Sequence, residues 1–253
     1  NFDAAEANIF LTGSNQWKKF DTWPPQNVEL KSLYFHPNGK LSFTKPTTNN
    51  SFDEYMSDPN APVPYQDGVQ ANRTREYMVD DQRFAARRPD VKTYQTDVLT
   101  EDITLTGPVL ANLLVSTSGT DADYVVKLID VYPEDTKEVS PADKDKMMAG
   151  YQMLVRGEIL RGKYRNSFEK PEAFVPNEAT KVKYALPDVG HTFKKGHKIM
   201  VQVQHSWFPL ADRNPQKFMN IYEAEPDDFQ KATHRIYHGN TDGSFLSLPI
   251  LKP

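Results

Sequence analysis

The sequence predicts an all-β fold, a β-sandwich with long surface excursions and one or two short helices. The chain of 253 residues contains nineteen prolines and twelve glycines. These residues interrupt short apolar runs about every ten to fifteen residues, which is typical of the strands and turns of a sandwich. Several runs alternate apolar and polar side chains, as half-buried strands require, and helical periodicity is scarce.

The clearest strands are expected at six places: Asp102–Thr106, Val109–Ser116, Tyr124–Val131, Thr180–Leu186, Lys198–Gln204 and Phe245–Ile250. The segment Thr180–Leu186 places apolar residues on one face and lysines on the other. In contrast, Val125–Ile129 is apolar on both faces apart from Lys127, which predicts a central strand that is covered on both sides. Asn38-Gly39, between two apolar runs, predicts a hairpin over residues 33–43.

Two stretches are expected to be irregular. Thr44–Asp90 contains five prolines and few apolar runs, and it predicts a long surface excursion. The second stretch, Pro133–Ala149, is charged and predicts a short helix over Pro141–Met148. A second helix is expected over Pro226–Ala232, because proline at its first position and acids in its first turn suit the exposed amides.

We expect two parts within one domain. Residues 1–90 form an N-terminal junction segment, the hairpin and the long excursion, all packed on the sandwich. Residues 91–253 form the main sandwich. The first residue is Asn rather than Met, which indicates a processed chain or a piece of something longer.

Charge and composition remove several classes of function. Thirty basic and thirty-four acidic residues give a net charge of -4, and neither sign clusters, so no nucleic acid or membrane partner is expected. No run approaches the roughly 18 apolar residues that span a bilayer. The chain has no cysteine, which excludes disulfides, thiol catalysis and cysteine metal sites. The compartment stays open between bacterial periplasm and cytoplasm, and we slightly favour the periplasm.

The search for catalytic residues predicts none in this chain. No serine has the Gly-x-Ser-x-Gly spacing that exposes a nucleophile between strand and helix. His205 and Ser206 are neighbours on an extended segment, where adjacent side chains point to opposite faces.

Metal ligands and cofactors are not predicted either. His234 and His238 lack the glutamate of a zinc protease motif, and an extended segment explains them better. The pairs Asp121-x-Asp123 and Asp212-x-Asn214 offer oxygen atoms, but neither continues into a calcium loop, so both are interpreted as turn residues.

A stand-alone carbohydrate- or protein-binding module is the alternative function. Sugars could stack on Trp17, Trp23 or Trp207. Burial in a core or an interface is the commoner role for tryptophan, but the alternative remains open. A shallow groove lined by exposed aromatic side chains would favour it.

Several motifs occur together along nearly the whole chain. They are FLTGSNQW (residues 10–17) with Trp23-Pro24, LTEDITLTGP (99–108), TDADYVVKLIDVYP (120–133), GEILRGKYR (157–165), and GHKIMVQVQ (196–204) followed by SWFP (206–209) and DRNP (212–215). In this order the motifs resemble the C-terminal jelly-roll domain, of galactose-binding-like fold, in the group of cocaine esterase, α-amino-acid ester hydrolase and glutaryl-7-aminocephalosporanic acid acylase, relatives of the X-Pro dipeptidyl peptidases. RTREYM (73–78) and DDQRF (80–84) are most similar to the ester hydrolases and acylases. His205 stands where relatives more often carry a small hydroxyl residue.

The resemblance implies that this chain is the non-catalytic C-terminal domain of a serine hydrolase. The catalytic serine, aspartate and histidine of such an enzyme lie upstream in an α/β-hydrolase domain, so its partners would be that missing domain and, through it, a small-molecule ester or amide substrate. This chain alone would be inactive.

The resemblance also suggests which residues face the rest of the enzyme. Substrate-facing contacts are expected in the excursion, at Arg75, Tyr77 and Met78. For Arg75 and Arg83, ion pairs with Asp80, Asp81 or Glu76 are the stronger alternative. Another set of three aromatic residues near the N-terminal junction is expected to meet the catalytic domain: Trp17, Phe20 and Trp23. An apolar face of this kind, left bare, favours self-association into a homo-oligomer.

Overall fold

The computed structural model describes residues 5–47, 51–68, 74–137, 147–239 and 241–252. Within them the strands are β1 (Ala7–Leu11), β2 (Gln16–Phe20), β3 (Val28–His36), β4 (Lys40–Ser42), β5 (Ser51–Ser57), β6 (Lys92–Gln95), β7 (Ile103–Thr117), β8 (Asp123–Val131), β9 (Gln152–Arg161), β10 (Thr180–Phe193), β11 (Lys198–Gln204), β12 (Ala232–His238) and β13 (Phe245–Leu251). The helical segments are α1 (Arg83–Ala86) and single turns at η1 (Pro37–Gly39), η2 (Glu76–Met78), η4 (Gly162–Tyr164), η5 (Ile221–Glu223) and η6 (Pro226–Asp228). The structure is therefore all-β, as the sequence predicts.

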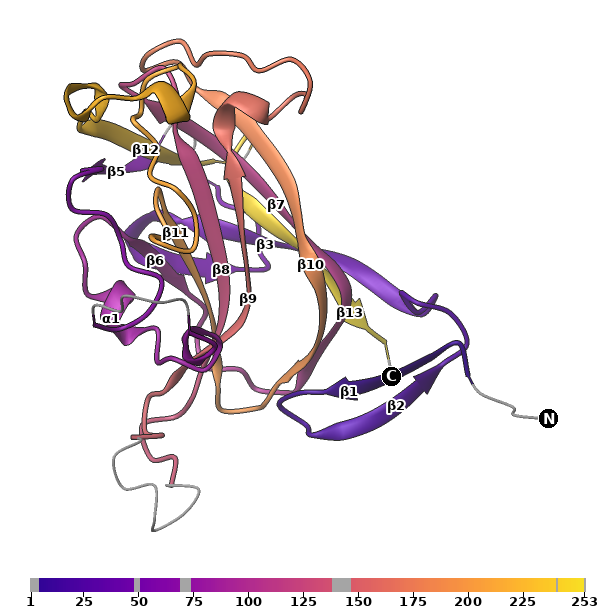
Figure 1. Ribbon diagram of the computed structural model, residues 1–253. Helices are drawn as coiled ribbons and strands as arrows, with labels where there is room; N and C mark the ends of the chain where they lie inside the picture. Colours follow the sequence, from indigo (N-terminus) through magenta and orange to yellow (C-terminus); the bar gives the residue numbers. More distant parts are fainter. Residues whose placement is uncertain (1–4, 48–50, 69–73, 138–146, 240, 253) are drawn as a thin grey trace.

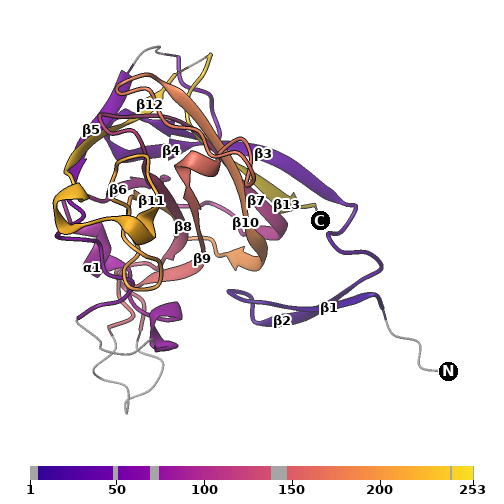
Figure 2. The ribbon, with the colours of Figure 1, turned by 45° about the horizontal axis from the view of Figure 1, so that its top comes forward.

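The strands form a folded-over sheet in two layers and a separate hairpin (Figures 1 and 2). One layer is centred on β7, which pairs with β10, β12 and β13, and β3 continues it next to β13. In the other layer the order is β6-β11-β8-β9, and the short β4 connects the layers. The two strands β1 and β2 pair only with each other and stand to one side of the body.

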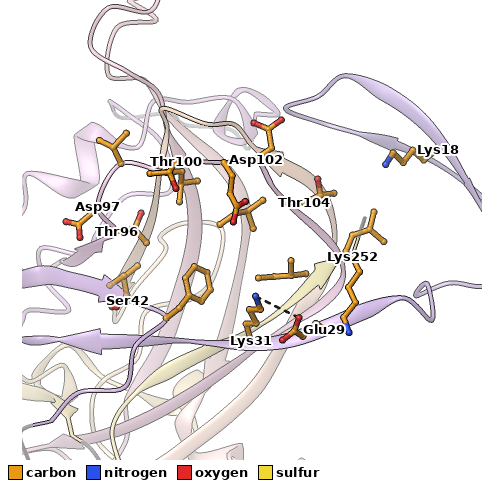
Figure 3. Close-up of a pocket in the computed structure, with 18 residues that line it drawn as sticks. Lys18, Glu29, Lys31, Ser42, Thr96, Asp97, Thr100, Asp102, Thr104 and Lys252 are labelled. Atoms are coloured by element: carbon orange, nitrogen blue, oxygen red, sulfur yellow. Dashed lines mark ion pairs between the residues drawn. The ribbon is translucent and has the colours of Figure 1, made fainter.

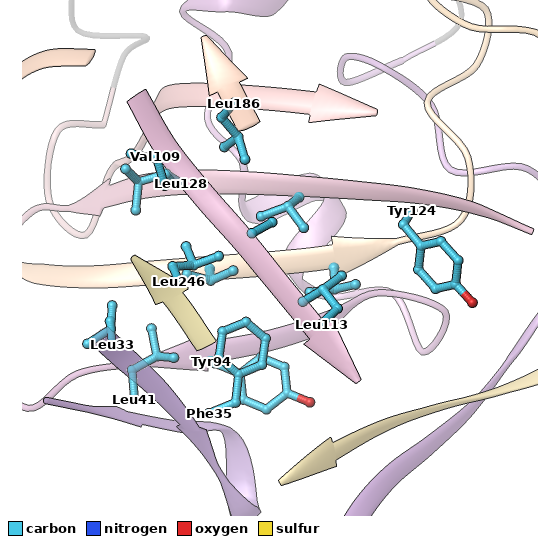
Figure 4. Packing of buried hydrophobic residues seen from close by; sticks show 14 of the residues in the cluster. Leu33, Phe35, Leu41, Tyr94, Val109, Leu113, Tyr124, Leu128, Leu186 and Leu246 are labelled. Atoms are coloured by element: carbon cyan, nitrogen blue, oxygen red, sulfur yellow. The ribbon is translucent and has the colours of Figure 1, made fainter. Parts of the chain in front are cut away.

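The core between the layers consists of branched aliphatic and aromatic side chains from both (Figure 4). Strand β8 is buried at every position, which confirms the expectation of a central strand covered on both sides. Its side chains at Tyr124, Val126 and Leu128 face the core between the layers. The alternate positions, among them Val125 and Ile129, pack outward under the loops that cover this layer.

The longest strands run beyond the sequence predictions. Two expected strands merge into the 15-residue β7, which passes through Gly107-Pro108. Opposite Gly107, β10 has an irregularity between Leu186 and Val189 and then continues to Phe193. A glycine and a bulge on the partner strand let both strands bend without ending.

The predicted hairpin over residues 33–43 is present. Strand β3 pairs with β4 in antiparallel register, with Phe35 opposite Leu41. The connecting turn holds Asn38 at φ 62° and Gly39 at φ 69°, the left-handed conformations that these two residue types adopt most readily.

Two expectations about local structure were wrong or incomplete. The helix expected over Pro226–Ala232 is only the single turn η6, because Ala232 already begins β12, which pairs with β5 and β7. The excursion contains an unexpected strand, β5, whose residues Phe52, Glu54 and Met56 face solvent at the sheet edge. The helix expected over Pro141–Met148 falls mostly outside the described residues.

The boundary near residue 90 stays a prediction. Strands from both sides of it share hydrogen bonds, since β3 pairs with β13 and β5 pairs with β12. Within the described ranges, no helix is both long and apolar enough to cross a membrane.

Two histidines stack inside the sandwich. The ring centroids of His205 and His234 are 3.5 Å apart. His205 shares hydrogen bonds with the Tyr55 hydroxyl at 2.7 Å and the Asp123 carbonyl at 2.6 Å, and His234 with Gln216 Oε1 at 2.5 Å. Burial lowers the pKa of His205 to about 4 and that of His234 well below its ordinary value, so both rings are neutral at pH 7.

We expect this pair to make the fold sensitive to acid. Below about pH 6.5 the unfolded chain binds protons that the folded rings do not accept, because the pKa of His205 is lowered to about 4 and that of His234 is also well below its ordinary value. The free energy of unfolding therefore falls as pH falls below about 6.5, by up to about 1.4 kcal/mol per pH unit for each histidine. His234→Asn removes one of the two titrating groups. We expect the free energy of unfolding, measured by urea titration, to fall less between pH 7 and pH 5 in this variant than in the wild type. His36→Asn, at a half-buried histidine outside the stacked pair, is the control and should keep the wild-type response to pH. If the free energy of unfolding of His234→Asn changed with pH as steeply as that of the wild type, the result would contradict this account.

Candidate functional site

The N-terminal hairpin is fastened to the edge strand β10 through one turn. Thr12 N–H donates to the Gly190 carbonyl at 3.1 Å, and Thr192 N–H donates to the Thr12 carbonyl at 2.8 Å. The Thr12 hydroxyl lies 2.8 Å from His191 Nδ1, and His191 Nε2 lies 3.1 Å from Asp130 Oδ2. Because His191 and Asp130 are fully buried, these contacts fix the hairpin against the interior.

Glycine allows the close approach of hairpin and strand. Gly13 has φ +79°, and a Cβ built there would lie 2.0 Å from the Thr192 carbonyl oxygen. On the other side, a Cβ at Gly190 would lie 2.9 Å from a methyl carbon of Ile9. Any larger residue at these two positions would push the hairpin away from β10.

Between this hairpin, the edge strands β9 and β10 and the excursion lies a groove of about 590 Å³. Its lining residues are Ile9, Phe10, Thr12, Trp23, Tyr77, Met78, Met153, Leu154, Val155, Arg156, Gly157, Pro187, Asp188, Val189, Gly190, His191 and Trp207. We call it the seam groove, because β9 and β10 are edge strands of the two layers and lie side by side without pairing in the described sheet (Figures 1 and 2). It is mainly apolar and aromatic, as small-molecule and docking sites often are.

The excursion reaches the groove because it covers the outer face of β8. Tyr77 packs on Trp207, with ring centroids 6.2 Å apart, and on Tyr65 at 5.4 Å. Tyr65 and Trp207 are buried and pack together with Val125 of β8. The segment is held further by Asp81, which accepts a hydrogen bond from Gln152 N–H of β9 at 3.3 Å.

A buried lysine lies under this cover. Lys127 Nζ donates to Gln82 Oε1 at 2.9 Å and lies 5.2 Å from the ring centroid of Trp207 and 5.5 Å from that of Phe84. Burial lowers the pKa of Lys127 to about 7, against the opposing effect of the Asp80 carboxylate. Gln82 Nε2 in turn donates to the Asp80 carbonyl at 2.9 Å, so the lysine ties the start of α1 to β8.

A second hollow of about 630 Å³ lies on the other side of the hairpin (Figure 3). Charged side chains of both signs surround it. Lys31 pairs with Glu29 at 3.8 Å, and Asp102 pairs with Lys194. We place the candidate site in the seam groove instead, because only that groove contains sequence-predicted site residues.

Of the three predicted substrate-facing residues, two line the seam groove and one does not. Tyr77 and Met78 line the seam groove, Tyr77 half-buried and Met78 50% exposed. Arg75 precedes η2 on the surface and does not line it. Arg83 pairs with Asp81, with Nε 2.6 Å from Oδ2, which confirms the ion-pair alternative for Arg83.

The three residues predicted to meet a catalytic domain lie on or beside the hairpin. Trp23 lines the groove, and its indole N–H donates to Asp188 Oδ2 at 2.5 Å. Phe20 packs on Trp23, with centroids 5.7 Å apart. Trp17 is 72% exposed and, of the aromatic rings in the described part of the chain, contacts Phe10 alone, at 5.5 Å. Their role in an interface stays a prediction.

The oxygen-bearing pairs noted in the sequence meet each other. Arg161 donates to both carboxylate oxygens of Asp123, at 3.0 and 3.1 Å, and Asn214 donates to Asp123 Oδ1 at 2.8 Å. Burial and the neighbouring Asp123 raise the pKa of Asp121 to about 6. Across the described part of the chain, no three His, Cys, Asp or Glu side chains come together as a metal site.

The neighbours His205 and Ser206 do not form a nucleophile and base. His205 bonds to Tyr55 and Asp123, whereas the Ser206 hydroxyl accepts Val63 N–H at 2.8 Å. His234 and His238 lie on strand β12, as expected for an extended segment.

Three groove residues were missed by the sequence analysis: Arg156, Asp188 and His191. No local motif marks them. Arg156 lies in β9, where nearly every residue is half-buried, Asp188 lies in the irregularity of β10, and His191 lies in the paired strand just after it. Only the pairing of the layers brings them beside the hairpin and the excursion.

The strand order and the two-sided burial of β8 define an all-β sandwich domain. Residues 3–247 match the family model described as the X-Pro dipeptidyl-peptidase C-terminal non-catalytic domain, and the chain belongs to this family. The resemblance noted in the sequence is thereby confirmed.

Relatives support the same assignment. The cocaine esterase of Rhodococcus sp. (strain MB1 Bresler) is 29% identical over 255 residues, covering 98% of this chain and 42% of the esterase. A crystal structure of an aminopeptidase from a marine sediment Thaumarchaeota archaeon superposes with a TM-score of 0.91 at 39% identity, over 99% of this chain and 41% of the aminopeptidase. The structure of an α-amino acid ester hydrolase superposes with a TM-score of 0.89 at 43% identity, over 96% of this chain and 40% of the hydrolase. The chain thus spans about two fifths of the length of these relatives.

We expect Gly157→Ala to disturb the groove floor. A Cβ at Gly157 would lie 2.8 Å from Cη2 of Trp207 and 3.5 Å from Cγ of Lys127, so the buried indole must shift. The free energy of unfolding should fall by about 1–3 kcal/mol in urea titrations. The control is the double variant with Trp207→Phe, whose smaller ring leaves room for the methyl group. In a double-mutant cycle, the double variant should lose less free energy of unfolding than the sum of the losses in the two single variants. Losses that simply add would contradict this interpretation.

Proposed function

We propose that this chain is the non-catalytic C-terminal domain of a serine hydrolase that cleaves ester or amide bonds, and that its seam groove faces the α/β-hydrolase domain of that enzyme. The observation that carries the proposal is the seam groove itself. It unites the hairpin, at the N-terminal side where a preceding domain would connect, with Tyr77 and Met78 of the excursion.

The groove and its surroundings carry apolar side chains that have little cover in this chain. Phe10 is 41% exposed, Trp17 72%, Met78 50% and Val79 68%. Exposed aromatic and methionine side chains grouped around a groove are typical of surfaces that bind another protein body. A hydrolase domain placed there would bury them and would share the groove with its substrate.

The substrate class comes from the relatives' names. An esterase, an aminopeptidase and an α-amino acid ester hydrolase all cleave an acyl bond by hydrolysis, and two of the three names specify an α-amino group or amino terminus. We therefore propose α-amino-acid esters, or related amides such as β-lactam acyl groups, for the whole enzyme. This domain would line the substrate pocket and leave the chemistry to the preceding domain.

The binding-module alternative also has a place in the structure. A hollow of about 450 Å³ is lined by Phe208, Tyr222 and Phe229, of which Tyr222 is 84% exposed. Arg213 lies over the Phe229 ring, 4.4 Å from its centroid, and donates to the Pro59 carbonyl at 3.0 Å. Sugar binding that is lost in Tyr222→Ala would favour a carbohydrate-binding module.

The isolated chain should be inactive. We expect no turnover of an amino-acid p-nitrophenyl ester at high protein concentration, and no covalent adduct with a serine-directed phosphonate by mass spectrometry. Stoichiometric labelling of one serine would overturn the proposal, because it would place a complete active site in this chain.

The isolated chain should also self-associate through the hairpin side of the groove. In sedimentation velocity, we expect its average mass to rise with concentration, since the bare apolar side chains have no other cover. Phe10→Ser with Trp17→Ser should weaken this association. Phe168→Ser, at a side chain that is 80% exposed and does not line the groove, is the matched control. Equal effects of the two changes would argue against the proposed interface.

A further inference from the structure

The seam groove contains an arginine with an unusual set of partners. Arg156 lies on β9 opposite Leu128 of β8, so its side chain projects toward β10 at the open seam. One terminal nitrogen, Nη2, donates to the Asp188 carbonyl of β10 at 2.6 Å. The Nε–H is buried and has no acceptor among the described residues.

Five other arginines of the described chain are paired with carboxylates, whereas Arg75 and Arg87 have no such pair and Arg213 lies over the Phe229 ring. The ion pairs are Arg83–Asp81, Arg88–Asp90, Arg161–Asp123, Arg165–Glu172 and Arg235–Glu54. Arg156 is half-buried and, among the described residues, has no carboxylate oxygen within 4.0 Å. A partly desolvated cation without a counter-ion is costly, and an anion bound beside it would offset that cost.

The acid nearest in the groove is already engaged. Asp188 also lines it, but its Oδ2 accepts the indole N–H of Trp23, and only its backbone carbonyl meets Arg156. Trp207, 6% exposed and part of the same wall, carries an indole N–H that no described atom accepts. The groove therefore has two N–H groups without an acceptor among the described residues, and its one arginine has no carboxylate within ion-pair distance.

We propose that the seam groove binds a carboxylate group at Arg156, with an aromatic or apolar body attached to it lying against Phe10, Trp23 and Tyr77. The planar guanidinium matches a carboxylate in geometry and charge, and the aromatic wall supplies contact for the attached body. The carboxylate comes from one of two sources: a free small molecule, such as a carboxylate-bearing substrate or product, or an acidic side chain of the hydrolase domain. The inference rests on the proposed function only if the carboxylate belongs to the hydrolase domain.

Phenylacetate is the probe, because it joins one carboxylate to one aromatic ring. Titrated into this chain and followed by calorimetry or NMR, it should bind with a Kd of about a millimolar, which suits so small a ligand. Phenylacetamide has the same shape without the charge and should bind at least tenfold more weakly. Arg156→Met and Arg156→Gln should both weaken phenylacetate binding at least tenfold, and Arg156→Lys should weaken it less.

Arg75→Met is the matched control, since it removes an exposed cation that does not line the groove. It should leave binding unchanged, and circular dichroism should show all variants folded. Equal binding of phenylacetamide, or full binding by both Arg156→Met and Arg156→Gln, would overturn the inference. So would the absence of phenylacetate binding.

The longer enzyme distinguishes the two sources. Phenylacetate that binds both the isolated chain and the longer enzyme identifies a small-molecule carboxylate. Binding to the isolated chain alone means that an acidic side chain of the hydrolase domain fills the site. Failure of phenylacetate binding would leave the ester assay and the self-association experiment unaffected, so the two proposals can fail separately.

Discussion

The burial of strand β8 on both faces is the constraint on which the rest of the structure depends. In a two-layer sandwich, the layers bury only the faces that meet, so the other face of a central strand is normally solvated. Here Val125, Ile129 and Val131 occupy that outer face and require a cover of their own. The excursion and the loop after β11 cover Val125 with Tyr65 and Trp207, and Met200 and Leu154 of the neighbouring strands pack with Ile129 and Val131. The groove is the place where this cover ends.

Lys127 is the exception on the outer face, and it explains how the cover is oriented. An apolar residue there would bury as much surface but would specify no partner, whereas the lysine requires an acceptor and finds it in Gln82. Burial of the ammonium group is unfavourable, and the same burial lowers the pKa of Lys127. Between about pH 7 and the ordinary lysine value of 10.5, the unfolded chain binds the proton more readily than the folded chain, so this group opposes folding most strongly at neutral and lower pH. A buried ion of this kind fixes position rather than adding stability.

Sequence patterns predict the parts of this fold that follow from local rules. Alternation locates most of the long strands, Asn38-Gly39 locates a turn, and the apolar run at β8 predicts its central place. Strand β5 was not predicted because polar residues occur on both of its faces. Asp53 and Ser57 are polar residues at inward positions, so the sequence does not alternate between apolar and polar residues as a half-buried strand usually does. The helix expected at residues 226–232 fails for a related reason, because sheet pairing of β12 outweighs a favourable helix start.

The site follows from a different kind of information. Tyr77, Met78 and Trp23 were accessible through the resemblance, since they lie in motifs that the family shares. Arg156 and His191 were not, because their significance depends on which strands become edges. A jelly roll leaves β9 and β10 as neighbouring edges without a ladder between them, and the side chains at that seam must satisfy one another or bind something else.

The hairpin makes the seam a groove instead of an open edge. Among the described residues it pairs with the main sheet only around Thr12, and those contacts depend on the absence of side chains at Gly13 and Gly190. Asp130 and His191 extend this attachment into the interior of the sandwich, so the position of the hairpin is set by the core and not by its own short strands. Because the hairpin lies at the N-terminal side of the chain, the hydrolase domain proposed to precede it would be oriented by the same contacts. The geometry that shapes the groove would therefore also determine how the groove meets that domain.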